Sequence, residues 1–167
     1  MRECKSRTTE INNKSRMVAG YCWKWKSKKD PNAFDVIIPE HNFKMRWNLY
    51  KDGSSWIIAE NSVNEIGCIH TCQGLELDYV GVIVGEDLRY KSDEIFTDVS
   101  RRDSNDHSVR GIKAILRKNQ KEGIEIADRI IKNTYRTLMT RGLKGCYVYF
   151  CDKELEKYFK EKLKTSI

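Results

Sequence analysis

The sequence predicts a three-layer α/β domain with a mainly parallel sheet, and two observations support this fold class. Short apolar runs rich in β-branched residues, such as Tyr79 to Val84, are bounded by glycines, as is typical of parallel strands covered on both faces. An amphipathic stretch over residues 122–140 leads through glycines into a further apolar run, Cys146 to Phe150. A helix that leads into a buried strand indicates the alternating order of an α/β fold.

The strands are predicted from apolar runs bounded by turn residues. Two weaker candidates, at residues 34–38 and 55–59, are separated by a predicted turn at 51–54, and we expect them to pair at a sheet edge. The stronger candidates are predicted to be buried core strands, and they lie at residues 17–23, 65–70, 79–84 and 146–150.

The remaining segments are predicted to be helices and one loop. Residues 3–14 are polar and helix-compatible. Residues 122–140 repeat their apolar side chains at the spacing of one helical face, and residues 153–163 form a charged helix with its apolar residues facing inward. Residues 89–110 are polar, charged and poor in apolar periodicity, so we expect a mobile loop there.

Length and charge limit the classes of protein to consider. The 167 residues are within the range of one domain, so we treat 1–167 as a single domain. Lys and Arg number 31 against 24 acidic residues, and the net charge of +7 is compatible with binding to nucleic acid or with a solvated basic surface. No apolar run approaches the roughly 20 residues that cross a bilayer, and no secretory signal is present. We therefore expect a cytoplasmic protein with no membrane partner.

The six cysteines are predicted to be reduced packing residues. Cys68, His70 and Cys72 lie close together, but structural zinc sites combine paired knuckles from separate places, and no second knuckle accompanies this one. Cys22 and Cys146 lie in apolar runs, where a free cysteine packs as a small hydrophobe. The sequence therefore predicts no metal site.

Two motifs resemble those of superfamily 1 helicases. Residues 69–80 (IHTCQGLELDYV) resemble motif V, and residues 136–141 (RTLMTR), which end a predicted helix before a glycine-containing turn and a strand, resemble motif VI. Over about the whole chain, the sequence is similar to the C-terminal half of the Schlafen-like DNA/RNA helicase family. It departs from the wider superfamily at Cys68, where motif V often has Thr, and at Gly142, where Ala is commoner.

The resemblance implies a second RecA-like domain that completes an ATP site shared with a first RecA-like domain of the same protein. Arg141 is then the arginine finger, because a guanidinium offers fixed donors to the charge that develops on the phosphoryl oxygens. Gln73, Gly74 and Glu76 are predicted to contact the nucleotide, with Glu76 accepting a hydrogen bond from a ribose hydroxyl. Arg16 is a candidate for a second phosphate-sensing arginine. The structural alternatives are an ion-paired surface arginine at 141 and a solvated glycine turn at 74.

A single-stranded DNA or RNA is the second expected partner. His70 and Thr71 belong to motif V, and the resemblance implies that they contact nucleic acid. Next to the first predicted strand, stacking faces alternate with positive charges, a combination used by proteins that bind single strands. The residues of this alternation are Trp23, Lys24, Trp25 and Lys26. Half-buried packing residues remain an equal alternative for the two tryptophans.

No Gly-Lys-Ser or Gly-Lys-Thr is present, so the chain lacks a phosphate loop of its own. Residues 82–87 resemble a Walker B strand, but such a strand acts with a phosphate loop, so Asp87 is predicted to be a turn or helix-start residue. We expect ATP with Mg²⁺ as cofactor only together with the first domain, and a chain that is inactive alone and belongs to a longer protein. The alternatives are a stand-alone nucleic-acid-binding or interaction module with a RecA-like fold, and a nuclease-like domain using the acidic residues at 94–106.

Overall fold

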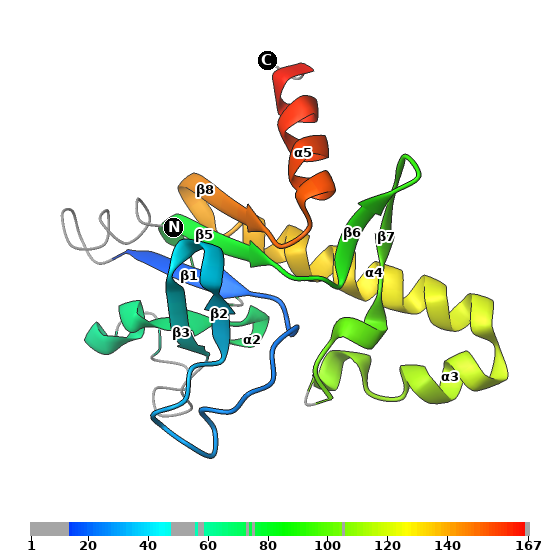
Figure 1. Ribbon diagram of the computed structural model, residues 1–167, viewed down its shortest axis with the longest axis horizontal. Coiled ribbons are helices and arrows are strands. Elements are labelled where there is room, and N and C mark those ends of the chain that lie inside the picture. The colour runs from blue at the N-terminus through cyan, green and yellow to red at the C-terminus, as the bar shows by residue number, and fades with distance from the viewer. Residues whose placement is uncertain are drawn as a thin grey trace.

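The computed structural model describes residues 14–47, 56, 59–72, 74, 76–104 and 106–165, and these form a mainly parallel six-stranded sheet with helices packed against it (Figure 1). The strand order is β2-β3-β4-β1-β5-β8, and only the pairing of β2 with β3 is antiparallel. The predicted RecA-like α/β fold class is confirmed. The strands are β1 (Ser15–Ala19), β2 (Val36–Ile38), β3 (Phe43–Trp47), β4 (Glu65–Gly67), β5 (Leu77–Val84) and β8 (Gly142–Phe150).

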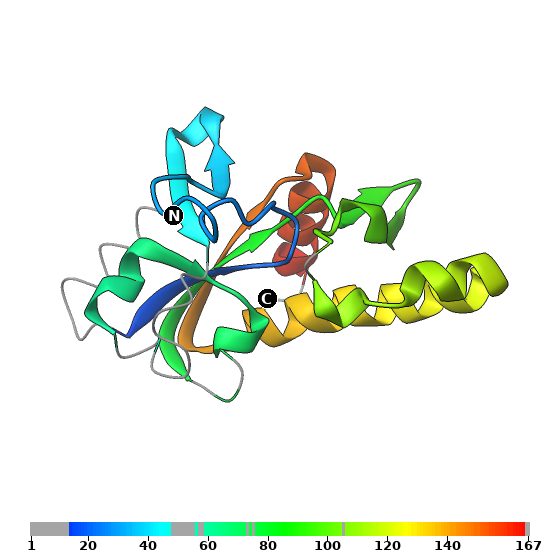
Figure 2. The same ribbon diagram turned by 90° about the horizontal axis from the view of Figure 1, so that it is seen from below.

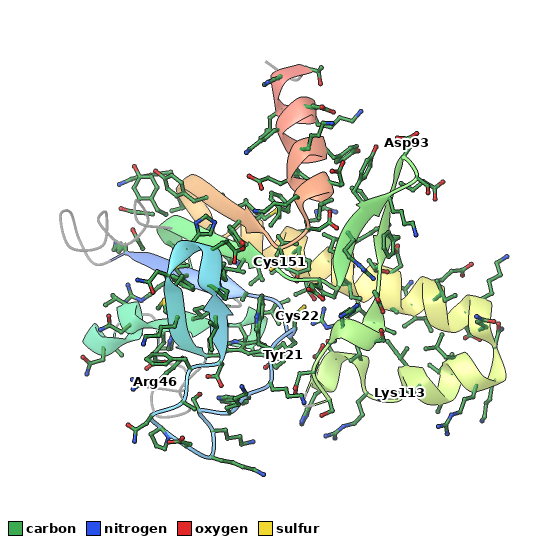
Figure 3. The ribbon with its side chains drawn as sticks, viewed as in Figure 1. Tyr21, Cys22, Arg46, Asp93, Lys113 and Cys151 are labelled. Carbon is green, nitrogen blue, oxygen red and sulfur yellow. The ribbon has the colours of Figure 1, made fainter. Side chains whose placement is uncertain are left out.

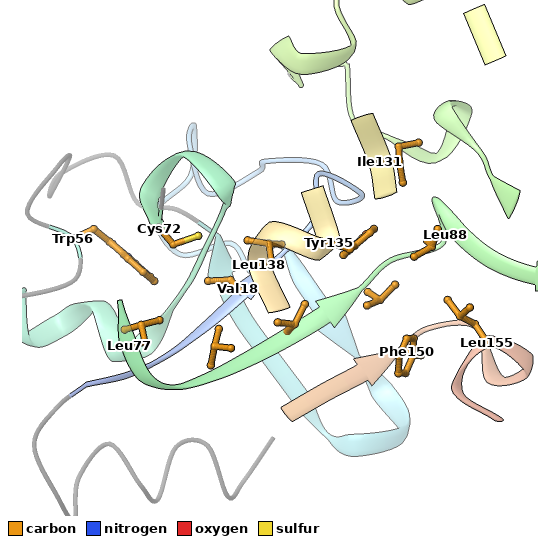
Figure 4. Close-up of a cluster of buried hydrophobic side chains, with 13 residues drawn as sticks. Val18, Trp56, Cys72, Leu77, Leu88, Ile131, Tyr135, Leu138, Phe150 and Leu155 are labelled. Carbon is orange, nitrogen blue, oxygen red and sulfur yellow. The ribbon is translucent and has the colours of Figure 1, made fainter. Parts of the chain in front are cut away.

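The centre of the sheet is buried on both faces, which explains its continuous apolar runs. Successive residues of β1 point to opposite faces, so that Val18 joins one apolar cluster while Met17 and Ala19 join the other. Figure 4 shows the first cluster, in which Val18 lies near Tyr135 and Leu138. Full burial of a side chain such as Val18 or Leu138 stabilises the fold by about 1.5–3 kcal/mol.

The long helix α4 (Gln120–Met139) covers one face of the sheet and continues beyond it, with α3 (Ile112–Lys118) alongside (Figures 1 and 2). Its buried residues Ala127, Ile131 and Tyr135 recur at helical spacing and form the predicted apolar face. The helix begins at the cap residue Asn119, whose side chain accepts a hydrogen bond from the Glu122 N–H. Two further helices are α2 (Ile69–Cys72) and α5 (Lys153–Thr165).

The segment predicted to be a mobile loop, residues 89–110, is instead largely structured, and that prediction is wrong. It contains most of a hairpin of β6 (Leu88–Lys91) and β7 (Glu94–Thr97), followed by the 3-10 turns η5 (Val99–Arg101) and η6 (His107–Val109). Ser92 and Asp93 both adopt positive φ, the conformation that a two-residue hairpin turn requires. The short strands lack a strong apolar pattern, and for this reason the sequence did not indicate them.

Other differences follow from long-range pairing. The predicted strand at 34–38 pairs with β3, a strand that the sequence analysis missed because lysine and arginine interrupt it. Three further predictions cannot be compared with the structure, because most or all of their residues lie outside the described part of the chain. They are the expected partner strand at 55–59, the turn at 51–54 and the helix at 3–14. Cys146, predicted to pack in the core, is exposed, because β8 is the edge strand. Within the described residues no helix is both long and apolar enough to span a membrane.

Candidate functional site

The parallel strands give the sheet two chemically different edges. Because β1, β4, β5 and β8 are parallel, their amino ends lie at one edge and their carboxyl ends at the other. At the amino edge, the Leu77 N–H donates to the Arg141 carbonyl oxygen at 2.9 Å. This hydrogen bond brings Glu76, which precedes β5, next to Arg141, which precedes β8. Glu76, predicted to bind the nucleotide, and Arg141, predicted to be the catalytic arginine, are therefore adjacent along the backbone of the fold.

Arg141 is held by the end of α4. Its backbone N–H donates to the Leu138 carbonyl oxygen at 3.3 Å, and its Nε donates to the Thr137 carbonyl oxygen at 3.2 Å. The side chain is half-buried and forms no ion pair with any carboxylate in the described part of the chain. A Cβ on the next residue, Gly142, would lie 2.2 Å from the Gly145 carbonyl oxygen. This clash explains why the chain has Gly at position 142, where the wider superfamily commonly has Ala.

The loop between α2 and β5 presents an open backbone. Gly74 has a φ of +78°, which favours glycine, and a Cβ added there would meet nothing within 4 Å. Gly74 and Glu76 are both exposed. Gln73 lies outside the described residues. The loop thus brings an exposed glycine and an exposed carboxylate to the edge of the sheet where the half-buried Arg141 lies.

Arg16 also lies near the amino edge, but its side chain is directed into the protein. The residue is only 1% exposed, its Nε donates to Ser62 Oγ at 2.8 Å, and its guanidinium lies 6.0 Å from the centroid of the Trp56 ring. Burial lowers the pKa of Arg16 from its ordinary value. In this arrangement Arg16 is covered by Trp56 and is not brought into contact with Arg141.

An aromatic group lies at the opposite, carboxyl edge. Tyr21 follows β1, and its ring centroid lies 4.7 Å from that of Trp47 at the end of β3 and 6.0 Å from that of His70 in α2. Trp23 meets the same Trp47 ring edge-on at 6.3 Å. The structure thus joins two predicted nucleic-acid contacts, Trp23 and His70, through two aromatic residues that the sequence analysis missed. Their position at strand ends on one edge could have indicated them.

The basic loop after β1 (residues 24–29) is fixed to the sheet by a buried carboxylate. Asp35 accepts hydrogen bonds from the Ser27 N–H at 2.9 Å and from the Trp47 N–H at 2.7 Å. Lys24 and Lys26 remain exposed on this loop. Trp25, from the same loop, is half-buried, with Lys28 Nζ 5.1 Å from its ring centroid. The loop therefore offers positive charge on a defined backbone.

Cys68, directly after β4, and the residues of α2, which resemble motif V, have mainly local partners. Thr71 Oγ1 accepts from the Cys68 N–H at 2.8 Å and donates to the Cys68 carbonyl oxygen at 2.9 Å, which fixes the start of α2. Cys68 is fully buried, and its sulfur accepts a hydrogen bond from the Tyr21 hydroxyl at 3.4 Å. Cys72 packs beside it, and burial raises the pKa of the Cys72 thiol to about 12. Among Cys68, His70, Thr71 and Cys72, only His70 is exposed.

A buried polar network lies beneath the carboxyl edge. Asp87 is 0% exposed and accepts hydrogen bonds from the Tyr135 hydroxyl at 2.5 Å and from Arg102 Nη1 at 3.1 Å. Arg102 Nε donates to Asp106 at 2.5 Å, and although burial lowers the pKa of Arg102, the two carboxylates raise it overall. Asp87 lies in a turn, as predicted, and its carboxylate is committed to this network. Within the described residues, no group of three or more His, Cys, Asp or Glu is arranged to hold a metal ion.

Comparison with known proteins gives one family. A family model described as "Schlafen group 3, DNA/RNA helicase domain" matches residues 1–152. The protein named "Uncharacterized protein YPL245W" from Saccharomyces cerevisiae is 32% identical over 118 residues, which make up 70% of this chain and 25% of that protein. The matched segment therefore spans about a quarter of the relative's length. No solved structure gives a significant match to this chain.

Proposed function

The chain belongs to the Schlafen group 3 DNA/RNA helicase domain family, and from this premise we propose that it is the second RecA-like motor domain of an ATP-dependent helicase or translocase. On this proposal it supplies one wall of an ATP site, and a first RecA-like domain of the same protein supplies the phosphate loop. The observation that best supports this proposal is the hydrogen bond between Leu77 and Arg141. It brings the segments that resemble motifs V and VI to one edge of the sheet.

Arg141 is the residue that we propose to act on the reaction. ATP hydrolysis develops charge on the phosphoryl oxygens, and a guanidinium held in place beforehand stabilises that charge without reorganising. The hydrogen bond from Arg141 Nε to Thr137 fixes the side chain through one donor, and among the described residues no hydrogen-bond partner engages its terminal amino groups, which could therefore meet a ligand. The half-buried position at the end of α4 supports this role because partial burial strengthens electrostatic interactions.

Gly74, Glu76 and Gln73 are proposed to bind the nucleotide in its ground state. The open space above Gly74 admits a phosphate close to the backbone, and the exposed Glu76 carboxylate can accept hydrogen bonds from ribose hydroxyls. ATP would bring Mg²⁺ with it, and its ligands would come from the first domain. Arg16 contributes to phosphate sensing on this proposal only if Trp56 moves away from its guanidinium.

The carboxyl edge is proposed to bind a single strand of DNA or RNA. Exposed lysines at 24 and 26 would contact phosphates, while Trp23, Trp25 and His70 present ring faces or edges to bases. Thr71 would act by fixing the start of α2, because its hydroxyl is bonded to Cys68 on both sides. The net charge of +7 supports attraction to a polyanion.

A stand-alone nucleic-acid-binding module is the second candidate function, and the absence of Gly-Lys-Ser or Gly-Lys-Thr from the chain favours it. ATP hydrolysis by the full-length protein separates the two functions. The motor proposal predicts turnover that Arg141→Ala abolishes or strongly reduces while nucleotide binding is kept. A full-length protein that binds single strands but hydrolyses no ATP would favour the binding module.

A further inference from the structure

A cavity of about 680 Å³ opens at the carboxyl ends of β1, β5 and β8, beside β2. Its wall includes Cys22 after β1, Glu86 after β5 and Cys151 after β8, together with residues 37–40 and 100–104. Figure 3 shows Cys22 and Cys151 at the centre of the molecule, with Tyr21 next to Cys22. In open α/β sheets, the carboxyl ends of strands are where ligands bind. The amino edge with Arg141 is the opposite edge, so this cavity is distinct from the proposed ATP site.

Two aromatic side chains of the wall are held in fixed positions. Trp23 is packed edge-on against Trp47 at 6.3 Å between ring centroids. The Tyr149 hydroxyl donates to Glu40 Oε1 at 2.6 Å, and its ring meets His41 edge-on at 5.3 Å. Rings that are already ordered lose little conformational freedom when a flat ligand stacks on them. The wall is therefore suited to a planar, aromatic ligand.

The charges of the wall fit a base better than a phosphate. Lys24, Arg101 and Arg102 face an equal number of acidic residues, and Arg101 is paired with Glu86 at 3.0 Å. Arg102 is engaged by two buried carboxylates, so the wall has no surplus of positive charge. Carboxylates accept several hydrogen bonds each and pair with the exocyclic amino groups of bases. The wall carboxylates are Glu40, Glu86 and Asp103. Each carboxylate has about four lone-pair sites, so it can accept a hydrogen bond from a ligand in addition to its present partners, such as Tyr149 on Glu40 and Arg101 on Glu86.

Positive charge lies instead at the rim. Lys24 lines the cavity and continues into the exposed basic loop with Lys26, Lys28 and Lys29. This arrangement separates an interior lined by aromatic rings and carboxylates from a cationic border, which matches a nucleotide whose base enters while its phosphates stay outside. Continuity with the loop favours a strand over a free nucleotide.

We propose that this cavity takes one unstacked base that carries an exocyclic amino group, from the single strand bound along the basic loop. The inference rests on the proposed strand-binding function, because Trp23 and Lys24 belong to both surfaces. It adds a preference among bases to a surface that otherwise binds any sequence. Cytosine, adenine and guanine fit this description, and thymine and uracil do not.

The experiment compares the affinity of this chain for cytosine-only and thymine-only DNA strands about 12 nucleotides long, by fluorescence anisotropy. Ile37→Trp fills the cavity, since Ile37 lines it and is 51% exposed, so a larger side chain can be accommodated. Ile124→Trp is the matched control, because Ile124 is 52% exposed on α4 and does not line the cavity. Circular dichroism checks that each variant is folded. The measured quantity is the ratio of the affinity for the cytosine strand to that for the thymine strand. Unspecific stacking of the new tryptophan on either strand therefore cancels in the ratio.

The wild type and Ile124→Trp are expected to bind the cytosine strand about fivefold or more tightly than the thymine strand. Ile37→Trp is expected to bind both strands alike. Equal affinities in the wild type, or a preference that survives Ile37→Trp, would overturn the cavity proposal while leaving strand binding in place. If neither strand binds the wild type, the proposed strand-binding function itself fails, and the cavity proposal fails with it.

Discussion

The Tyr135 hydroxyl donates a hydrogen bond to Asp87 at 2.5 Å, and this contact joins α4 to the turn at the carboxyl end of β5. The same oxygen accepts from the Gly85 N–H at 2.9 Å. Further along, α4 ends and places Arg141 at the amino edge of the sheet. One helix is therefore bonded to the carboxyl edge, where we propose strand binding, and carries the arginine that we propose to act at the ATP site.

Replacing Tyr135 by Phe is predicted to lower the free energy of unfolding by about 1–3 kcal/mol, because the buried Gly85 N–H and Asp87 carboxylate each lose a partner. Urea unfolding of this chain measures the change. Tyr90→Phe is the matched control, since the Tyr90 hydroxyl makes only an exposed contact of 3.4 Å to Asp93. Equal stability of the two variants would show that the buried network contributes little.

The cysteines are predicted to react with a thiol reagent in an order set by exposure and pKa. Burial raises the pKa of Cys72 and of Cys151 to about 12, so at pH about 8 both are almost wholly protonated and unreactive. Among the cysteines of the described residues, Cys146 is exposed and is expected to be alkylated first. Mass spectrometry of peptides after timed treatment with iodoacetamide gives the order, and the same treatment in urea is the control. Alkylation of Cys72 as fast as that of Cys146 would contradict the packing around α2.

Strand binding is predicted to weaken with salt, and the basic loop is predicted to set part of that dependence. Each phosphate contact adds about 0.7 to the slope of log affinity against log salt for single strands, so Lys24→Ala with Lys26→Ala should reduce the slope by about 1.4. The control pair is Lys113→Ala with Lys118→Ala, which are exposed on α3. Anisotropy titrations at several salt concentrations measure the slopes. If the slope falls equally in both double variants, Lys24 and Lys26 are not specific phosphate contacts, and the prediction is contradicted.

Sequence reasoning was sufficient where local pattern and fold agree. The apolar run of β5 and the helical periodicity of α4 predicted both elements, and they also predicted that motif VI would end a helix ahead of a strand. The adjacency of Glu76 and Arg141 came from motif resemblance, and the parallel pairing of β5 with β8 gives it a structural basis.

The parts that sequence reasoning missed depend on long-range contacts. Trp47 lies in β3, where Lys44 and Arg46 alternate with apolar residues, so the segment resembles an exposed one by sequence. Its pairing with β4 makes it part of the sheet. By composition Arg102 belongs to a polar loop, yet it is buried, because Asp87 and Asp106 neutralise its charge. Asp87 lies 15 residues away in the sequence. The local periodicity of the sequence does not indicate which residues form such pairs.

Glu76→Ala in the full-length protein is predicted to raise KM for ATP with kcat nearly preserved. A ribose contact is similar in the ground state and the transition state, so its loss weakens binding without slowing the chemical step. Steady-state ATPase assays with saturating single-stranded nucleic acid measure both constants. Glu122→Ala, an exposed carboxylate at the start of α4, is the control. A fall in kcat with unchanged KM would assign Glu76 to the reaction instead of to the ribose.

The most direct test of the motor-domain proposal is the kcat for ATP of the full-length protein carrying Arg141→Ala, measured with saturating single-stranded nucleic acid. If Arg141 is the arginine finger, kcat should fall by about a hundredfold or more with little change in nucleotide affinity, and Lys should rescue it poorly because it lacks the planar set of donors. Arg129→Ala, an exposed arginine on the same helix outside the motif, should retain wild-type kcat. Wild-type kcat in a folded Arg141→Ala protein would contradict the arginine-finger role.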